Sequence, residues 1–287
     1  MKNFTQGLIP LAFTLALAGA LVFGDAERRD ELTAERVAGK VSCVTSSFGG
    51  TIGVSVGDDG VLMIDSLFER HAGAVDAVLA TLSDDRPTFL INTHTHGDHV
   101  GGNAHFQKES TVVAHENVRL RMKAEGVAGL PTMTYGEGLS LYFNGEEIRL
   151  FHVENAHTDG DTIVWFRDSN VFHMGDCYFQ LGYPFIDVAR GGNVKGVIAA
   201  ARHVLDVAPE DARFIPGHGA VTGRKGLEEY VEMLETLTER VQEHLDQGDD
   251  VAAMVKLGIT EDFDGRWAGF VSPERFVGSV VASLKAR

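Results

Sequence analysis

Cysteine is scarce in this sequence. The 287 residues include only two, Cys43 and Cys177, so no disulfide framework is visible. Positive charge is also low, because 25 lysines and arginines stand against 41 aspartates and glutamates, a formal net charge of −16. A nucleic-acid-binding protein needs basic surface to neutralise phosphates, so this balance argues against nucleic acid as a partner. It argues equally against binding to anionic lipid.

Apolar runs long enough to cross a bilayer are also lacking. The longest, residues 8–23, is shorter than the ~20 residues that a membrane-spanning helix needs. Lys2 precedes this run and the small residues Ala-Gly-Ala end its core, which are the parts of a secretory signal peptide. We therefore predict a signal peptide at residues 1–26 and a mature domain at 27–287. The protein is expected to be periplasmic or secreted, with no membrane association after cleavage; an uncleaved anchor is the alternative.

The rest of the composition is that of a globular protein, with 44% hydrophobic and 23% charged residues. Residues 27–40 are charged and predict a loose lead-in. Alternating apolar residues around the turn at 57–60 predict a β-hairpin. Further short strands are predicted at 89–91, 111–114, 139–143, 148–153, 162–166, 171–174 and 213–215, and helices at 70–83, 116–123, 194–207, 227–245 and 273–284. This order predicts an α+β protein in which sheets pack face to face with helices outside.

The clearest chemical signal is a histidine-rich segment directly after an apolar strand. Residues 93–99 read Thr-His-Thr-His-Gly-Asp-His, which brings together His94, His96, Asp98 and His99. His94 and His96 are two residues apart, so they point the same way if strand geometry persists. Three imidazoles and a carboxylate are ligands that zinc favours. Several buried histidines together need partners or a metal, so the segment predicts a metal site.

Three further polar residues share one kind of position, just past an apolar strand and near a glycine: His157, Asp176 and His218. A rigid scaffold presents side chains from such positions into one cleft. One cluster cannot complete two metal sites, so we predict that these residues join the first segment. Cys177 follows Asp176 directly, and continued strand alternation would make the two point apart. We predict that Asp176 is the one that faces the metals.

This ordered set of residues resembles the metallo-β-lactamase superfamily, over about residues 42–220. The resemblance implies a four-layer αββα sandwich with two Zn²⁺ ions at one edge of the sheets. It implies that the first zinc is bound by His94, His96 and His157. It implies that the second is bound by Asp98, His99 and His218. Asp176 resembles the carboxylate that bridges both metals in glyoxalase II-like members.

Such a site implies a hydrolase in which a metal-bound hydroxide attacks the carbonyl of a small-molecule lactam, lactone, thioester or ester. Asp98 would orient the hydroxide and carry a proton to the leaving atom, which makes it the predicted catalytic residue. Asn193 resembles a substrate-binding asparagine near the β-lactamase oxyanion, with a helix N-cap as an equal alternative. Gln180 stands where one β-lactamase subclass has a lysine that binds the lactam carboxylate. A neutral amide lacks that charge, so any β-lactamase activity is expected to be weak or promiscuous.

Two other functions stay open at this point. A non-catalytic periplasmic protein that binds zinc or a partner would use the same ligands without turnover. A diiron oxidoreductase on the same fold is disfavoured, because such members usually carry glutamate where this chain has His96. Asp65, at the end of a strand, is predicted either to hold a ligand histidine or to be a simple turn residue. Substrate specificity is expected to reside in residues 125–135 and 180–190.

Overall fold

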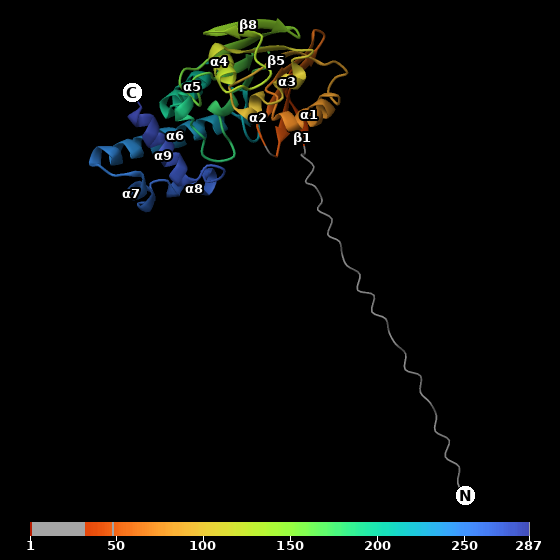
Figure 1. Ribbon diagram of the computed structural model, residues 1–287. Coiled ribbons are helices and arrows are strands. Elements are labelled where there is room, and N and C mark those ends of the chain that lie inside the picture. The colour runs from red at the N-terminus through yellow and green to blue at the C-terminus, as the bar shows by residue number, and fades with distance from the viewer. Residues whose placement is uncertain (2–31, 48, 287) are drawn as a thin grey trace.

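The computed structural model describes Met1, residues 32–47 and residues 49–286. Two β-sheets lie face to face, with helices on both outer sides (Figure 1). Apart from Met1, the predicted signal peptide lies outside the described residues. Among the helices of the described part, none is both long and apolar enough to span a bilayer.

The first sheet has seven strands in sequence order. They are β1 (Leu32–Ala38), β2 (Val41–Ser46), β3 (Ile52–Gly57), β4 (Gly60–Ile64), β5 (Pro87–Ile91), β6 (Thr111–His115) and β7 (Met133–Tyr135). Neighbours from β1 to β4 are antiparallel, whereas β4 to β7 are parallel. The predicted hairpin is confirmed as β3 and β4. For residues 32–38 the predicted loose lead-in is wrong, because β1 pairs with β2 as an edge strand whose charged Glu35 and Arg36 are exposed. Residues 27–31 of that prediction lie outside the described residues.

The second sheet has six strands. Across the sheet they are β13 (Thr222–Gly223), β12 (Arg213–Ile215), β11 (Val171–His173), β10 (Thr162–Phe166), β9 (Glu146–His152) and β8 (Gly138–Phe143). Only β11 and β12 run parallel; the other pairs are antiparallel. The N-terminal half of the described chain therefore builds one sheet, and the following part builds the other.

Helices cover the outer face of each sheet. Beside the first sheet are η1 (Glu69–His71), α1 (Ala72–Leu79), α2 (Gly97–Val100), α3 (Asn103–Phe106) and α4 (Glu116–Ala124). Beside the second are η2 (Gly175–Cys177), η3 (Val188–Arg190), α5 (Val194–Val207), α6 (Arg224–Gln247), α7 (Val251–Lys256), α8 (Glu261–Trp267) and α9 (Pro273–Lys285). The short helices α7 and α8 were not predicted. In Figure 1 the blue C-terminal helices gather on the side away from α1 and α3.

Strand β4 shows how alternation creates the layers. Leu62 and Ile64 point between the sheets, into a core that includes Val164 of β10. Val61 and Met63 point the other way, into the core under α1. A third apolar core lies between the second sheet and α5, α6 and α9. The order helix, sheet, sheet, helix is the predicted αββα sandwich.

Candidate metal centre

The seven predicted ligands lie at one edge of the two sheets, each just beyond a strand. The segment 94–99 follows β5, His157 lies between β9 and β10, Asp176 lies in η2 after β11, and His218 follows β12. The two sheets are joined at this edge, because Thr51 donates its N–H to the carbonyl of Gly217 at 2.7 Å. The structure thus brings together the side chains from all the strand ends that the sequence singled out.

Four side chains form the first cluster, and their candidate ligand atoms lie within 4.8 Å of one another: His94, His96, His157 and Asp176. His96 Nδ1 lies 3.2 Å from His94 Nε2 and 2.9 Å from His157 Nε2. Asp176 Oδ2 lies 3.6 Å from His157 Nε2 and 4.0 Å from His94 Nε2. Three ring nitrogens and a carboxylate oxygen therefore surround one point, which is a donor set that zinc accepts.

Asp98, His99 and His218 form the second cluster. His218 Nε2 lies 3.2 Å from Asp98 Oδ2, and His99 Nε2 lies 3.6 Å from the same oxygen. Asp176 also contacts this cluster, with Oδ1 at 3.3 Å from His99 Nε2 and Oδ2 at 3.5 Å from His218 Nε2. Asp176 therefore lies between the two clusters, where the resemblance places a bridging carboxylate.

His99 Nε2 and Asp176 Oδ1 are buried and lie 3.3 Å apart, but neither atom makes a hydrogen bond in the described structure. Leaving such atoms unsatisfied costs free energy unless another group binds them. The facing ring nitrogens of the first cluster also cannot all be protonated without donors meeting donors. Cations in the two clusters would satisfy both requirements, so the residues present fit two metal ions.

Burial and charge act differently on the two clusters. Burial lowers the pKa of His157 to about 4 and that of His94 well below its ordinary value, so both rings are neutral ligands near neutral pH. Burial opposes the charged form of His218, but Asp176 and Asp98 raise its pKa to about 9. Burial alone would raise the pKa of Asp98, yet His99 and His218 lower it to about 2. A cation entering the second cluster therefore displaces protons.

Glycines allow the backbone to approach these ligands. A Cβ atom on Gly50 would lie 2.7 Å from His99 Cε1, and one on Gly217 would overlap the carboxylate of Asp176. Gly175 has a φ of +51°, which lets the chain turn at the end of β11 and direct Asp176 into the site. A side chain at these glycine positions would therefore clash with the candidate ligands or strain the backbone that directs them.

Asp65 is both a turn residue and a hydrogen-bond partner of a candidate ligand histidine, the two roles that the sequence left open. It follows β4 with a φ of +62°, as a turn residue does. It is also fully buried, and its carboxylate accepts hydrogen bonds from His99 Nδ1 at 2.8 Å and from the backbone N–H of Thr93 at 2.7 Å. A carboxylate bonded to the outer nitrogen of a metal-ligating histidine fixes its ring orientation.

Residues 180–190, which we call the cleft loop, hold the outer nitrogens of His96 and His157. His96 Nε2 donates to Asp187 Oδ2 at 2.9 Å, and His157 Nδ1 donates to the carbonyl oxygen of Phe185 at 2.7 Å. Sequence reasoning missed both contacts. Asp187 lies 91 residues from His96 along the chain, and nothing in its surroundings marks it apart from other acidic residues.

A cleft of about 760 Å³ opens over the two clusters. Its walls are largely apolar and include Phe68, Phe179, Leu181, Phe185 and Phe270. Leu181 and Phe270 are 54% and 74% exposed, so they present apolar surface at the rim. Two arginines, Arg190 and Arg275, also line the cleft. This lining is complementary to an apolar group that carries a negative charge at its margin.

Three predicted or debated residues lie outside the ligand clusters. Cys177 is buried in the core that faces α5 and α6, because η2 replaces the expected strand and turns it away from Asp176. Asn193 caps α5, with Oδ1 accepting from the N–H of Lys195 at 2.9 Å. It does not line the cleft, so the capping alternative holds and the suggested substrate contact has no geometric support. The amide of Gln180 donates to the hydroxyl of Tyr178 at 2.6 Å.

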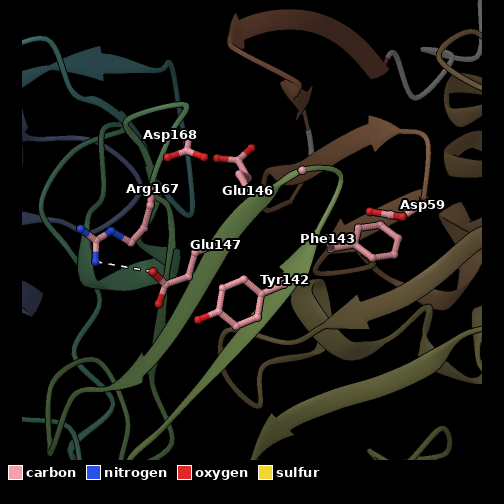
Figure 2. Close-up of a pocket in the computed structure, with 8 residues that line it drawn as sticks. Asp59, Tyr142, Phe143, Glu146, Glu147, Arg167 and Asp168 are labelled. Carbon is pink, nitrogen blue, oxygen red and sulfur yellow. Dashed lines mark ion pairs between the residues drawn. The ribbon is translucent and has the colours of Figure 1, made fainter.

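A second hollow lies at the opposite end of the sheets, beside the start of β4 and the turn between β8 and β9 (Figure 2). Its lining is mainly acidic, and Glu147 pairs with Arg167 at 3.6 Å. The buried Glu146 accepts from the backbone N–H and the hydroxyl of Ser169 at 3.0 and 2.9 Å. No histidine is among the described residues that line it. These contacts tie the turn between β8 and β9 to the segment after β10.

Comparison with protein families gives a match between residues 48–218 and the metallo-β-lactamase superfamily. A hydroxyacylglutathione hydrolase of Nitrosococcus oceani is 29% identical over 174 residues, which are 58% of this chain and 59% of that protein. Another, from Methylococcus capsulatus, is 34% identical over 95 residues, 32% of this chain and 34% of that protein. The chain therefore matches less than two thirds of the length of either relative.

Solved structures share the architecture. A metallo-β-lactamase from Pontibacter korlensis superposes with a TM-score of 0.63 and 19% identity, over 71% of this chain and 99% of that chain. The DIM-1 metallo-β-lactamase gives a TM-score of 0.62 and 20% identity, over 72% of this chain and 98% of its own. At this identity the likeness concerns the fold alone, and it confirms the predicted sandwich.

Proposed function

Because this chain belongs to the metallo-β-lactamase superfamily, we propose that it is a binuclear zinc hydrolase acting on the carbonyl group of a small molecule. The observation that carries the proposal is the convergence of seven donors in two clusters with Asp176 between them. The scissile bond is a lactam, lactone, thioester or ester. The two hydroxyacylglutathione hydrolases among the relatives make thioesters the first class to test.

Bound zinc would supply a water acidified to a pKa of about 7 and a Lewis acid for the carbonyl oxygen. The protein's own residues do the rest. His94 and His157 present neutral nitrogens, and Asp176 provides an oxygen toward each cluster. Asp98 lines the cleft with Oδ2 3.2 Å from His218 Nε2, where it takes a proton from the attacking water and returns it to the leaving atom.

The cleft walls position the substrate. Phe68, Phe179 and Phe185 exclude bulk water from the reacting groups, which strengthens electrostatic interactions there. Arg190 is already paired with Asp187 at 2.7 Å and Glu125 at 2.9 Å. Arg275 lies over the ring of Phe185 at 4.9 Å, and its guanidinium is the cation placed to meet a negatively charged substrate group.

The test is turnover of a panel of lactams, lactones, thioesters and esters by the purified protein, zinc-loaded and metal-stripped. Asp98→Ala should lower kcat/KM by at least 100-fold on any true substrate, because both metal binding and proton transfer suffer. Asp168→Ala is the matched control, since Asp168 is exposed in the hollow at the opposite end. Zinc-independent turnover, or full activity in Asp98→Ala, would refute the proposal.

Two alternatives remain distinguishable by the same preparations. A protein that only binds zinc or a partner would hold two zinc ions and hydrolyse nothing on the panel. A diiron oxidoreductase would contain iron rather than zinc on metal analysis. We also propose that the mature protein is periplasmic or secreted; fractionation of cells expressing the full chain, with N-terminal sequencing, tests this.

A further inference from the structure

The cleft loop does two things at once. Its side chains Leu181 and Phe185 form part of the wall that a substrate meets. Its Asp187 side chain and Phe185 carbonyl hold the outer nitrogens of two ligands of the first cluster. These bonds commit the protons of His96 to Nε2 and of His157 to Nδ1, which leaves the opposite nitrogen of each ring for the metal.

The loop is held in place from outside the metal centre. Tyr183 stacks on Phe276 of α9 with ring centroids 4.6 Å apart, and its hydroxyl donates to Asp264 of α8 at 2.9 Å. At its other end, Arg190 pairs with Glu125 beyond α4. One end of the loop is thus fixed to the C-terminal helices α8 and α9, and the other end is fixed to the residue after α4. Between these two ends the loop contacts the first metal cluster.

Asp187 is the central contact in this connection. It is buried, and it accepts from His96 Nε2 at 2.9 Å and from an Arg190 nitrogen at 2.7 Å on the same oxygen. Its other oxygen accepts from the backbone N–H of Arg190 at 3.1 Å. Moving the loop would therefore remove the acceptor that orients His96.

We propose that Asp187 is a positioning residue that makes retention of the first metal depend on the arrangement of the cleft loop. The dependence is reciprocal: the metal fixes His96, and His96 fixes the wall that contacts substrate. This inference rests on the metal site of the proposed function, but it concerns metal retention and loop order rather than turnover.

The first test measures zinc retention against a competing chelator. Full-length His218→Ala is the background, because it leaves the first cluster as the complete one. Adding Asp187→Ala should weaken zinc binding by about 10- to 100-fold, the usual effect of removing such a partner. Asp187→Asn should lie between, because its amide oxygen still accepts from His96 without the charge. Cobalt substitution should show a shifted visible spectrum for Asp187→Ala.

The second test measures the loop itself. Amide hydrogen exchange of residues 181–190 should slow when zinc is added to the otherwise unaltered chain, and this zinc-dependent protection should shrink in Asp187→Ala. Asp76→Asn is the matched control, because Asp76 also lies between a histidine and an arginine, His105 at 2.7 Å and Arg86 at 2.6 Å, away from the metals. It should leave both measurements unchanged.

Zinc retention unchanged in Asp187→Ala would overturn the inference, as would loop protection that is the same with and without zinc. An equal loss in Asp76→Asn would also overturn it, because the effect would then be general destabilisation. Loss of zinc in Asp187→Ala together with no hydrolysis by the unaltered protein would support the inference and reject the proposed function. The two claims therefore fail separately.

Discussion

Asp65→Asn should disable the second metal cluster without touching a ligand. The carboxylate accepts three hydrogen bonds, from the N–H and hydroxyl of Thr93 at 2.7 Å each and from His99 Nδ1 at 2.8 Å. An amide has one oxygen, and it must face the backbone N–H of Thr93, because that group can only donate. The NH₂ group then faces the hydroxyl of Thr93 and His99 Nδ1. The conflict is relieved when His99 moves its proton to Nε2, the nitrogen that points at Asp98 and Asp176. That tautomer cannot bind a metal.

The expected loss is about 10- to 100-fold in affinity for the second zinc, which equals about 1.4–2.8 kcal/mol. In metal-free protein the free energy of unfolding should fall by about 1–3 kcal/mol, the cost of leaving a buried hydrogen-bonding group without its partner. Chelator competition and urea unfolding measure the two effects. Asp161→Asn is the control, because Asp161 is also buried and accepts from the N–H and the hydroxyl of Thr158 at 2.8 and 2.6 Å, whereas its contact to His157 is with the backbone and not with the ring. Two zinc ions bound with unaltered affinity in Asp65→Asn would refute this reasoning.

Three further predictions concern other features. Gly50→Ala should release the second zinc more readily, because its Cβ would lie 2.7 Å from His99. Gly73→Ala is the control, because its Cβ meets open space in α1 and should stabilise the fold by up to about 1 kcal/mol. Zinc analysis measures the first effect and urea unfolding measures the second. Cys177→Ala should keep two zinc ions per chain, and loss of one on metal analysis would make the thiol a ligand. His115→Asn should flatten the stability loss of metal-free protein below pH 6.5. Burial and the stacked His152 lower the pKa of His115, so the folded state binds fewer protons than the unfolded state and is destabilised as pH falls; an unchanged urea profile between pH 7.5 and 5.5 would contradict this.

The convergence of the seven candidate ligands could be predicted because strong local signals coincide at each of them. A strand was recognisable from its apolar residues, and the polar residue after it stood near a glycine, as at His157 and His218. Strand β1 was missed because an edge strand exposes charged side chains, and exposed alternation such as that around Glu35 looks like an irregular segment.

Local sequence patterns did not predict the contacts that hold the candidate ligands in place. Asp187 reaches His96 because tertiary contacts such as that of Tyr183 with Phe276 of α9 hold the cleft loop, and no sequence spacing encodes them. Cys177 shows the related limit of periodicity. Strand alternation separated it from Asp176 correctly, but the separation arises from the turn η2 rather than from a continuing strand.

The two clusters draw on both halves of the sandwich. Residues 94–99 come from the sheet built before residue 136, whereas His157, Asp176 and His218 come from the sheet built after it. Neither half alone supplies all the donors of a cluster, because His157 and Asp176 of the first cluster come from the second half, and Asp98 and His99 of the second cluster come from the first half. Each zinc ion would therefore cross-link the two halves, and the metal content of a sample would report whether the two halves are correctly packed against each other.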